Sequence, residues 1–177
     1  VEVFFNDLKR QFILNFIEKD RWKLMVTGLE NTLKITIVAA IIGIFIGILL
    51  ASIRSTYDKQ YETLKKHRGF KYYVLSFLNF IAQVYLTVIR GTPVVVQLLI
   101  AFFIIFASAK NGVTIAMLAF GINSGAYVAE IFRGGIMAID NGQFEAGYSL
   151  GFNYFQTMIF IVIPQVLKNV LPMLLNE

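Results

Sequence analysis

The chain has 177 residues, of which 57% are hydrophobic and 15% charged, with a net charge of +5 and no cysteine. Soluble domains have about 45–50% apolar and about 25% charged residues, so this composition excludes an ordinary soluble domain, and the lack of cysteine excludes disulfides and thiolate metal sites within this sequence. The basic residues flank long apolar runs, so the positive charge indicates a membrane surface rather than a nucleic acid.

Residues 1–22 are the first predicted element, an amphipathic helix. Apolar side chains recur there at helical spacing between charged ones, at Phe5, Leu8, Phe12 and Phe16. A helix of this type lies in the membrane interface, where Trp22 would anchor it. We therefore separate an N-terminal segment, 1–22, from a membrane domain, 23–177.

The first predicted span covers residues 29–53, and Gly43 and Gly47 give it the spacing that allows close packing of two helices. The basic segment 54–73 follows, and the positive-inside tendency places it in the cytoplasm as a loop. Six of its residues are basic and two are acidic: Arg54, Lys59, Lys65, Lys66, Arg68 and Lys71 against Asp58 and Glu62. We expect its histidine, His67, to be solvated.

Residues 74–107 decide the topology. About 34 residues are too many for one straight span and too few for two spans with a turn. Arg90, Gly91 and Pro93 interrupt the run. We therefore predict an interfacial or steeply tilted helix over 74–89 and one crossing over 92–107.

A single crossing fixes the sides of the remaining elements. Residues 113–132 return to the cytoplasm, 133–156 form a polar cytoplasmic segment, and 157–175 cross again. The predicted fold is an all-α, polytopic membrane helix bundle of about four spans. It includes an N-terminal interfacial helix and a short cytoplasmic helix.

The polar segment contains the short helix. Asp140 or Asn141 can cap its start, and Gly151 can end it in the left-handed conformation. Phe144, Tyr148 and Leu150 are then expected to project together as an exposed face. Such a face requires a docking surface, either on the chain's own bundle or on a partner.

A second polar group interrupts the span 113–132. Asn123, Tyr127 and Glu130 share one helix face near the membrane midplane, beside Ser124. Polar side chains at this depth face a bundle interior or an aqueous path. They are therefore candidates for lining a substrate pathway; the alternative is contact between helices, with Glu130 paired to Arg133. Arg90 and Thr92 are either a second contact region or a structural kink, and we favour the kink.

The polar segment also resembles a known pattern, the EAA loop of the membrane subunits of ABC importers. The matching residues are Glu145, Ala146, Gly147, Gly151, Ile161, Ile163 and Pro164. Gly147 replaces the usual second alanine and Ile163 the usual leucine. Four further motifs resemble the polar amino acid permease branch of the family: "GLENTLKIT" (28–36), "VIRGTPVVVQL" (88–98), "SGAYVAEIFRGGI" (124–136) and "PQVLKNVLP" (164–172).

The resemblance implies a non-catalytic permease subunit in the bacterial inner (plasma) membrane, with five spans in the full protein and a C-terminal truncation here. It also implies partners: two ATPase subunits that bind ATP and Mg, a second permease subunit, identical or a sister chain, and an extracytoplasmic binding protein. The chain itself has no phosphate-binding G-x-x-x-x-G-K-[ST] motif. The residues expected to couple it to the ATPase are Gln143, Phe144, Glu145, Ala146, Gly147, Tyr148, Ser149 and Gly151.

Other classes of protein are less well matched by the sequence. An ion- or proton-coupled secondary transporter requires intramembrane carboxylates and usually two related halves, whereas Glu130 is the one plausible intramembrane acid and no repeat is visible. A channel or a structural scaffold would fit the composition but would not require a capped cytoplasmic helix. An enzyme would require paired catalytic groups, which no span offers. The transported amino acid and the choice between homodimer and heterodimer stay open.

Overall fold

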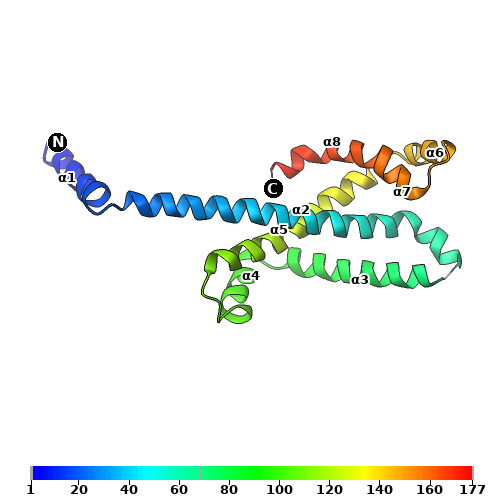
Figure 1. Cartoon of the computed structure of the whole chain (residues 1–177), viewed down its shortest axis with the longest axis horizontal. Coiled ribbons are helices and arrows are strands. Elements are labelled where there is room, and N and C mark those ends of the chain that lie inside the picture. The colour runs from blue at the N-terminus through cyan, green and yellow to red at the C-terminus, as the bar shows by residue number, and fades with distance from the viewer. Residues whose placement is uncertain (1, 68, 177) are drawn as a thin grey trace.

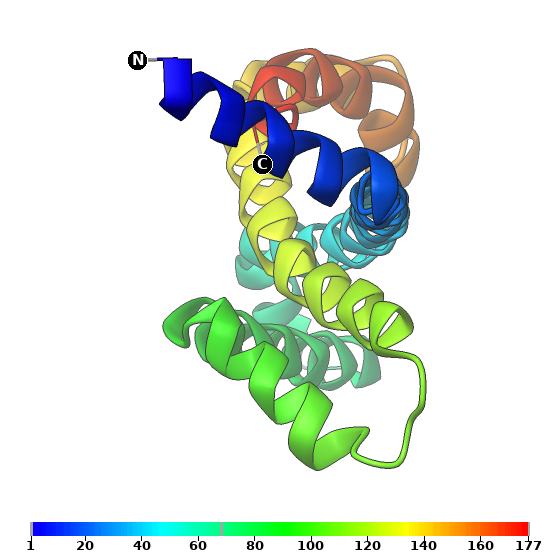
Figure 2. The same ribbon diagram turned by 90° about the vertical axis from the view of Figure 1, so that its left-hand side faces the viewer.

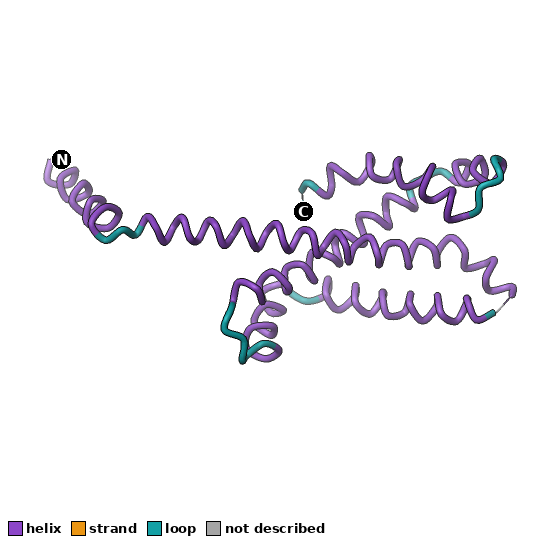
Figure 3. The backbone as a smooth tube through the Cα atoms, in the orientation of Figure 1, coloured by secondary structure: helices purple, strands orange, loops and turns teal. Residues whose placement is uncertain are grey.

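The computed structural model describes residues 2–67 and 69–176, and the regular elements of this part are helices (Figures 1 and 3). In chain order they are α1 (Glu2–Phe12), α2 (Trp22–His67), α3 (Phe70–Gly91), α4 (Val94–Ile100), α5 (Gly112–Met137), α6 (Asn141–Ser149), α7 (Tyr154–Thr157) and α8 (Ile163–Leu174). Short π-helical segments occur at Ile13–Glu18, Ala101–Ile105 and Met158–Val162. The predicted all-α fold is confirmed.

Four helices in the described part of the chain are long and apolar enough to cross a membrane. They are Trp22–Tyr61, Phe70–Gly91, Gly112–Met137 and Tyr154–Leu174. Large apolar side chains are exposed along them, among them Phe45 and Phe80. Hydrocarbon is the natural neighbour of such surfaces, so the predicted bundle of about four spans is confirmed.

The N-terminal segment is helical from Glu2 to Phe12, as predicted, and none of the residues of α1 is buried. The rings of Phe12 and Phe16 stack with their centroids 4.9 Å apart. Figure 1 shows α1 set apart from the bundle at the N-terminal end of α2, and Figure 2 shows it lying across that end. Its position in a membrane interface stays a prediction.

The predicted loop 54–73 is wrong over most of its length, because α2 continues as one helix of 46 residues to His67. No glycine or proline interrupts residues 54–67, so every backbone N–H can keep its helical hydrogen bond. The charged residues from Arg54 onward therefore mark the end of the apolar part of α2, whereas the helix itself continues to His67. The side chain of His67 lies outside what the structure describes.

The assignment of the two halves of residues 74–107 is also wrong. α3 has 22 residues and runs back beside the second half of α2 (Figure 1), whereas Val94–Ile105 is a shorter apolar helix. The helix begins at Phe70, inside the supposed loop, and this earlier start gives α3 the length of a span. The predicted interruption is present, because Thr92 and Pro93 have extended backbones with ψ of 142° and 136°.

The basic and the polar segments lie at the same end of the molecule, as predicted. After α4 the chain turns back, and α5 returns toward the C-terminal end of α2 (Figure 1). There Arg133 Nη1 donates to Asp58 Oδ2 at 3.2 Å, and Lys59 Nζ donates to Asn141 Oδ1 at 2.7 Å. The chain therefore leaves this end once, through α3, and returns once, through α5, between these two segments.

α2 and α5 pack closely because small residues face each other. A Cβ atom added to Gly43 would lie 2.8 Å from Ser124 Oγ, and one added to Gly47 would lie 2.6 Å from Val128 Cβ. Glycines permit this approach of two helices, so the predicted packing role of both residues is confirmed. α5 presents two glycines of its own to α2, Gly121 and Gly125.

A buried apolar cluster joins α5 to α6, α7 and α8. Its members include Phe132, Ile136, Phe144, Val162, Val166 and Val170. Burial of a large apolar side chain stabilises packing by roughly 1.5–3 kcal/mol. The cluster thus fixes the short helix α6 on the rest of the bundle through Phe144.

Candidate functional site: the short helix α6 and the polar face of α5

Local chemistry defines both ends of α6. Asp140 is the N-cap residue, and its Oδ1 accepts the N–H of Gly142 at 2.6 Å. Gly151 has φ of +82°, the left-handed conformation predicted for it, and its N–H donates to the carbonyl of Tyr148 at 2.9 Å. These caps make α6 a defined nine-residue helix between α5 and α7.

One face of α6 packs on the chain's own bundle. Phe144 is only 6% exposed and stacks on Tyr154 with ring centroids 6.5 Å apart. Gly147 is also buried, and a Cβ added to it would lie 2.6 Å from Thr157 Oγ1. The prediction of an exposed Phe144 is therefore wrong. Helical spacing places Phe144 and Tyr148 on neighbouring positions of one side of α6. The helix is oriented so that Phe144 and Gly147 face the bundle, and Tyr148 lies at the edge of this contact.

The rest of the surface of α6 is open. Tyr148 is 49% exposed and Leu150 is 71% exposed. The remaining exposed residues of the predicted coupling set are Gln143, Glu145, Ala146, Ser149 and Gly151. The structure therefore places seven of the eight predicted residues on α6 and Gly151 just after it, with Phe144 and Gly147 buried and the other six exposed.

Lys59 of α2 connects this helix to the longest helix of the bundle. Its Nζ lies 2.7 Å from Asn141 Oδ1 and 4.7 Å from the centroid of the Phe144 ring. From the other side, Gln165 Nε2 of α8 donates to Gln143 Oε1 at 3.0 Å. A hydrogen bond and a cation–π contact thus hold α6 to α2, and an amide pair holds it to α8. From the sequence, Lys59 is only one basic residue of a predicted loop, and its contacts with α6 are not predicted.

The second group of candidate residues lies where α5 faces α3 and α4. Asn123 Nδ2 donates to Gln97 Oε1 at 3.0 Å. Gln97 Nε2 in turn donates to Thr92 Oγ1 and to the carbonyl of Ile89, both at 2.7 Å. Gln97 therefore bridges the break between α3 and α4 to α5. Gln97 was not among the predicted site residues, although a lone glutamine within "VVVQLLI" is a visible polar interruption.

Further along α5, Glu130 contacts two arginines. Its carboxylate lies 3.5 Å from Arg90 Nη1 and 3.3 Å from Arg133 Nη2. The guanidinium of Arg90 also lies over the ring of Tyr127, 5.8 Å from its centroid. The alternative pairing of Glu130 with Arg133 is thus present, together with a contact across to α3. Arg90 takes part in this cluster as well as preceding the kink.

Ser124 is placed differently from its neighbours. Its side chain faces Gly43 in the close contact between α2 and α5. With Asn123 it also borders an open cavity of about 510 Å³ next to Thr32 and Thr36 of α2. The predicted pathway residues therefore divide between the two sides of α5 instead of sharing one surface.

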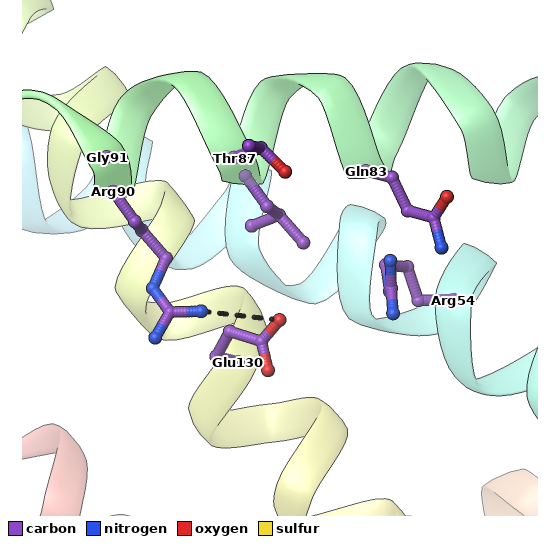
Figure 4. A pocket seen from close by; sticks show the side chains of 7 residues that line it. Arg54, Gln83, Thr87, Arg90, Gly91 and Glu130 are labelled. Carbon is purple, nitrogen blue, oxygen red and sulfur yellow. Dashed lines mark ion pairs between the residues drawn. The ribbon is translucent and has the colours of Figure 1, made fainter.

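An open cavity of about 470 Å³ lies between α2, α3 and α5, next to the Arg90–Glu130 pair (Figure 4). Side chains from all three helices line it: Arg54, Gln83, Leu86, Thr87, Arg90 and Glu130. Arg54, Gln83 and Thr87 were not among the candidate residues. Their contribution depends on the packing of α3 against α2, which helical periodicity does not reveal.

Within residues 2–67 and 69–176, no group of three or more His, Asp or Glu side chains is placed to hold a metal ion.

Residues 43–177 match the family model described as "Binding-protein-dependent transport system inner membrane component". The chain belongs to this family. It is therefore a component of an amino acid ABC transport system in a bacterial inner membrane, and a transport subunit rather than an enzyme. The match confirms the family that the sequence motifs indicate. It favours this family over the alternatives of a secondary transporter or a channel.

Individual members of this family are similar to the chain over most of its length. The chain is 36% identical to the putative glutamine transport system permease protein GlnP of Rickettsia felis, over 94% of the chain and 69% of that protein. It is 38% identical to the arginine transport system permease protein ArtQ of Bacillus subtilis, over 86% of the chain and 64% of that protein. The chain thus spans about two thirds of the length of these relatives.

A solved structure shares the fold. The crystal structure described as an amino acid ABC transporter with histidines superposes with a TM-score of 0.70 at 36% identity. The match covers 92% of this chain and 69% of that one. The helical arrangement described above is therefore that of a permease of this family.

Proposed function

We propose that this chain is the permease subunit of an ATP-binding-cassette importer for polar amino acids, and that α6 is the helix through which an ATPase moves it. Two ATPase subunits would bind ATP and Mg, one beneath each permease subunit. The second permease subunit would be identical or a sister chain. An extracytoplasmic binding protein would deliver the amino acid.

The two faces of α6 are the observation that carries this proposal. Tyr148 on α6 is 49% exposed, and Leu150, the residue that follows the helix, is 71% exposed, whereas Phe144 and Gly147 of the same helix are buried. Exposed aromatic and apolar side chains on a short rigid element are typical of protein contact surfaces. The surface lies at the same end as the basic segment of α2, on the side that the positive-inside tendency assigns to the cytoplasm.

The contacts of α6 also supply a route for movement. The helix is bonded to α2 through Lys59, to α8 through Gln143, and to α7 through the stacked ring of Phe144. Displacement of α6 therefore displaces three other helices, because its caps and packed face keep it rigid. A flexible loop at this position would absorb the same force.

The polar face of α5 supports a path for a polar solute. Asn123, Tyr127 and Glu130 lie along one helix and contact residues of α3 and α4. Relatives of the chain carry names of permeases for glutamine, arginine and L-cystine. These solutes share the amino acid group and differ in the side chain, which favours polar amino acids as the substrate class.

A cross-linking experiment tests the coupling role, and the absence of cysteine from this chain simplifies it. In the assembled transporter we expect Ser149→Cys on α6 to cross-link to an ATPase subunit through a short thiol-directed reagent. Ser108→Cys, in the exposed turn after α4, is the matched control and should give no such product. Reaction of Ser149→Cys with an impermeant maleimide from outside intact cells would contradict the proposal.

A further inference from the structure

Arg54 of α2 is a partly buried arginine for which the described side chains supply no acidic partner. It projects from α2 toward α3 and borders the cavity of about 470 Å³, close to Gln83 (Figure 4). Its Nε is buried and has no hydrogen-bond partner, and among the described side chains no acid pairs with Arg54. A buried N–H group without a partner costs free energy, so an anion in the cavity that accepts from this Nε would remove that cost.

The charges around the cavity do not balance. Glu130 bonds to Arg90 at 3.5 Å and to Arg133 at 3.3 Å, and Arg133 also bonds to Asp58 at 3.2 Å. Both acids are therefore already paired, and three arginines face two carboxylates. The surplus positive charge is that of Arg54.

We propose that Arg54 binds the carboxylate of the transported amino acid in this cavity, and that the cavity favours an amino acid with an uncharged side chain. This inference rests on the proposed function and names the substrate class of its pathway. Arginine matches a carboxylate with two parallel N–H donors, which gives both orientation and affinity.

The lining of the cavity explains the preference for an uncharged side chain. Glu130 is the acid among the described lining residues, and its pairing with two arginines leaves it unavailable for a cationic substrate. Gln83 and Thr87 offer an amide and a hydroxyl instead (Figure 4). These groups suit a neutral polar side chain such as a carboxamide.

Binding to the unaltered transporter gives the first test. The full-length permease with its ATPase subunits, purified without the binding protein, is dialysed against radiolabelled glutamine. We expect saturable binding that glutamine competes at least tenfold better than 4-aminobutanamide, which is glutamine without its carboxylate. Arginine should compete at least tenfold worse than glutamine. Equal competition by 4-aminobutanamide, or no saturable binding of glutamine, would overturn the carboxylate assignment; equal or better competition by arginine would overturn the neutral side chain.

Variants of Arg54 give the second test. Arg54→Gln should weaken glutamine binding at least tenfold, whereas Arg54→Lys, which keeps the charge, should weaken it less than Arg54→Gln does. Arg10→Gln removes the same charge from the exposed helix α1 and should bind as the unaltered protein does. Wild-type affinity in Arg54→Gln would overturn the proposal. If Arg54→Gln does not assemble, the competition with 4-aminobutanamide in the unaltered protein decides.

The same preparations separate this inference from the proposed function. Copurification of the ATPase and ATP-driven uptake of any amino acid by the unaltered complex support the permease assignment by themselves. If the complex takes up amino acids but the unaltered protein and Arg54→Gln bind glutamine with equal affinity, Arg54 has no role in binding and the permease assignment is still supported. A complex without ATPase and without uptake would remove both.

Discussion

The two faces of α5 are built differently. Toward α2 the contact consists of glycines and small side chains, with Gly43 and Gly47 opposite Ser124 and Val128. Toward α3 and α4 it includes a hydrogen bond of 3.0 Å from Asn123 to Gln97 and an ion pair of 3.5 Å between Glu130 and Arg90. The first face fixes the distance between two helices, since no atom can be added without a clash. The second face carries polar side chains, and it is the side on which we propose the path for solute.

The largest effect is expected from crowding the glycine face. Gly47→Leu would force its side chain into Val128 and Ala129 of α5, and overpacking of this kind costs about 3 kcal/mol. We expect a lower melting temperature and a lower yield of monodisperse protein in detergent. Gly28→Leu is the control, since nothing lies within 4 Å of a Cβ at that position on the same helix. Equal losses in both variants would show that α2 and α5 do not pack closely.

A charge change on the polar face should affect transport more than assembly. Glu130→Gln leaves Arg90 and Arg133 without the carboxylate that joins them. We expect the rate of amino acid uptake in vesicles to fall at least tenfold, about 1.4 kcal/mol in barrier height, while the ATPase subunits still copurify.

Glu30→Gln is the matched control for this carboxylate. Glu30 pairs with Lys34, but its side chain is 59% exposed, so uptake should not change. Loss of assembly in Glu130→Gln with unchanged uptake per remaining complex would favour the alternative, a purely structural role of Glu130 between helices.

A smaller effect is expected at α6, which is held by a buried apolar face and by polar contacts with α2 and α8. Lys59→Met removes the hydrogen bond to Asn141 and the contact with the ring of Phe144. We expect uptake per ATP hydrolysed to fall by about threefold, the equivalent of about 0.7 kcal/mol, with assembly intact. Lys65→Met, which removes a lysine over Tyr61 on the same helix, should leave this ratio unchanged. Identical ratios in the two variants would count against a role of Lys59.

The smallest effect is expected from a single hydrogen bond on the polar face. Asn123→Leu removes the 3.0 Å bond to Gln97, which keeps its bonds to Thr92 and Ile89. The net loss of unfolding free energy should be about 1 kcal/mol, measured by thermal denaturation in detergent. A loss as large as that of Gly47→Leu would show that the polar face is as rigidly specified as the glycine face.

Features that depend on local chemistry could be predicted from the sequence. The N-cap at Asp140, the left-handed Gly151 and the glycine pair of α2 follow from residue type and spacing, and the structure shows all three. The family motifs were equally accessible, since they are contiguous stretches such as residues 124–136. In each case the physical cause lies within a few residues of its effect.

Features that depend on how helices pack could not be predicted. Phe144 was expected on the exposed face of α6, because spacing defines a stripe but not the side against which it packs. Arg54 and Lys59 were assigned to a loop, because charge was taken as the end of a helix. Their contacts with the cavity and with Asn141 exist only because α2 continues past them.

The unbroken length of α2 has a mechanical consequence. At about 1.5 Å per residue, its 46 residues extend about 70 Å, well beyond the hydrocarbon thickness of a bilayer. Lys59 lies about 18 Å past Gly47 along this rod. A tilt of about 10° about the glycine contact would therefore swing Lys59 sideways by about 3 Å, comparable to the 2.7 Å that separates it from Asn141. A small tilt of α2 is therefore enough to form or break the hydrogen bond between Lys59 and α6.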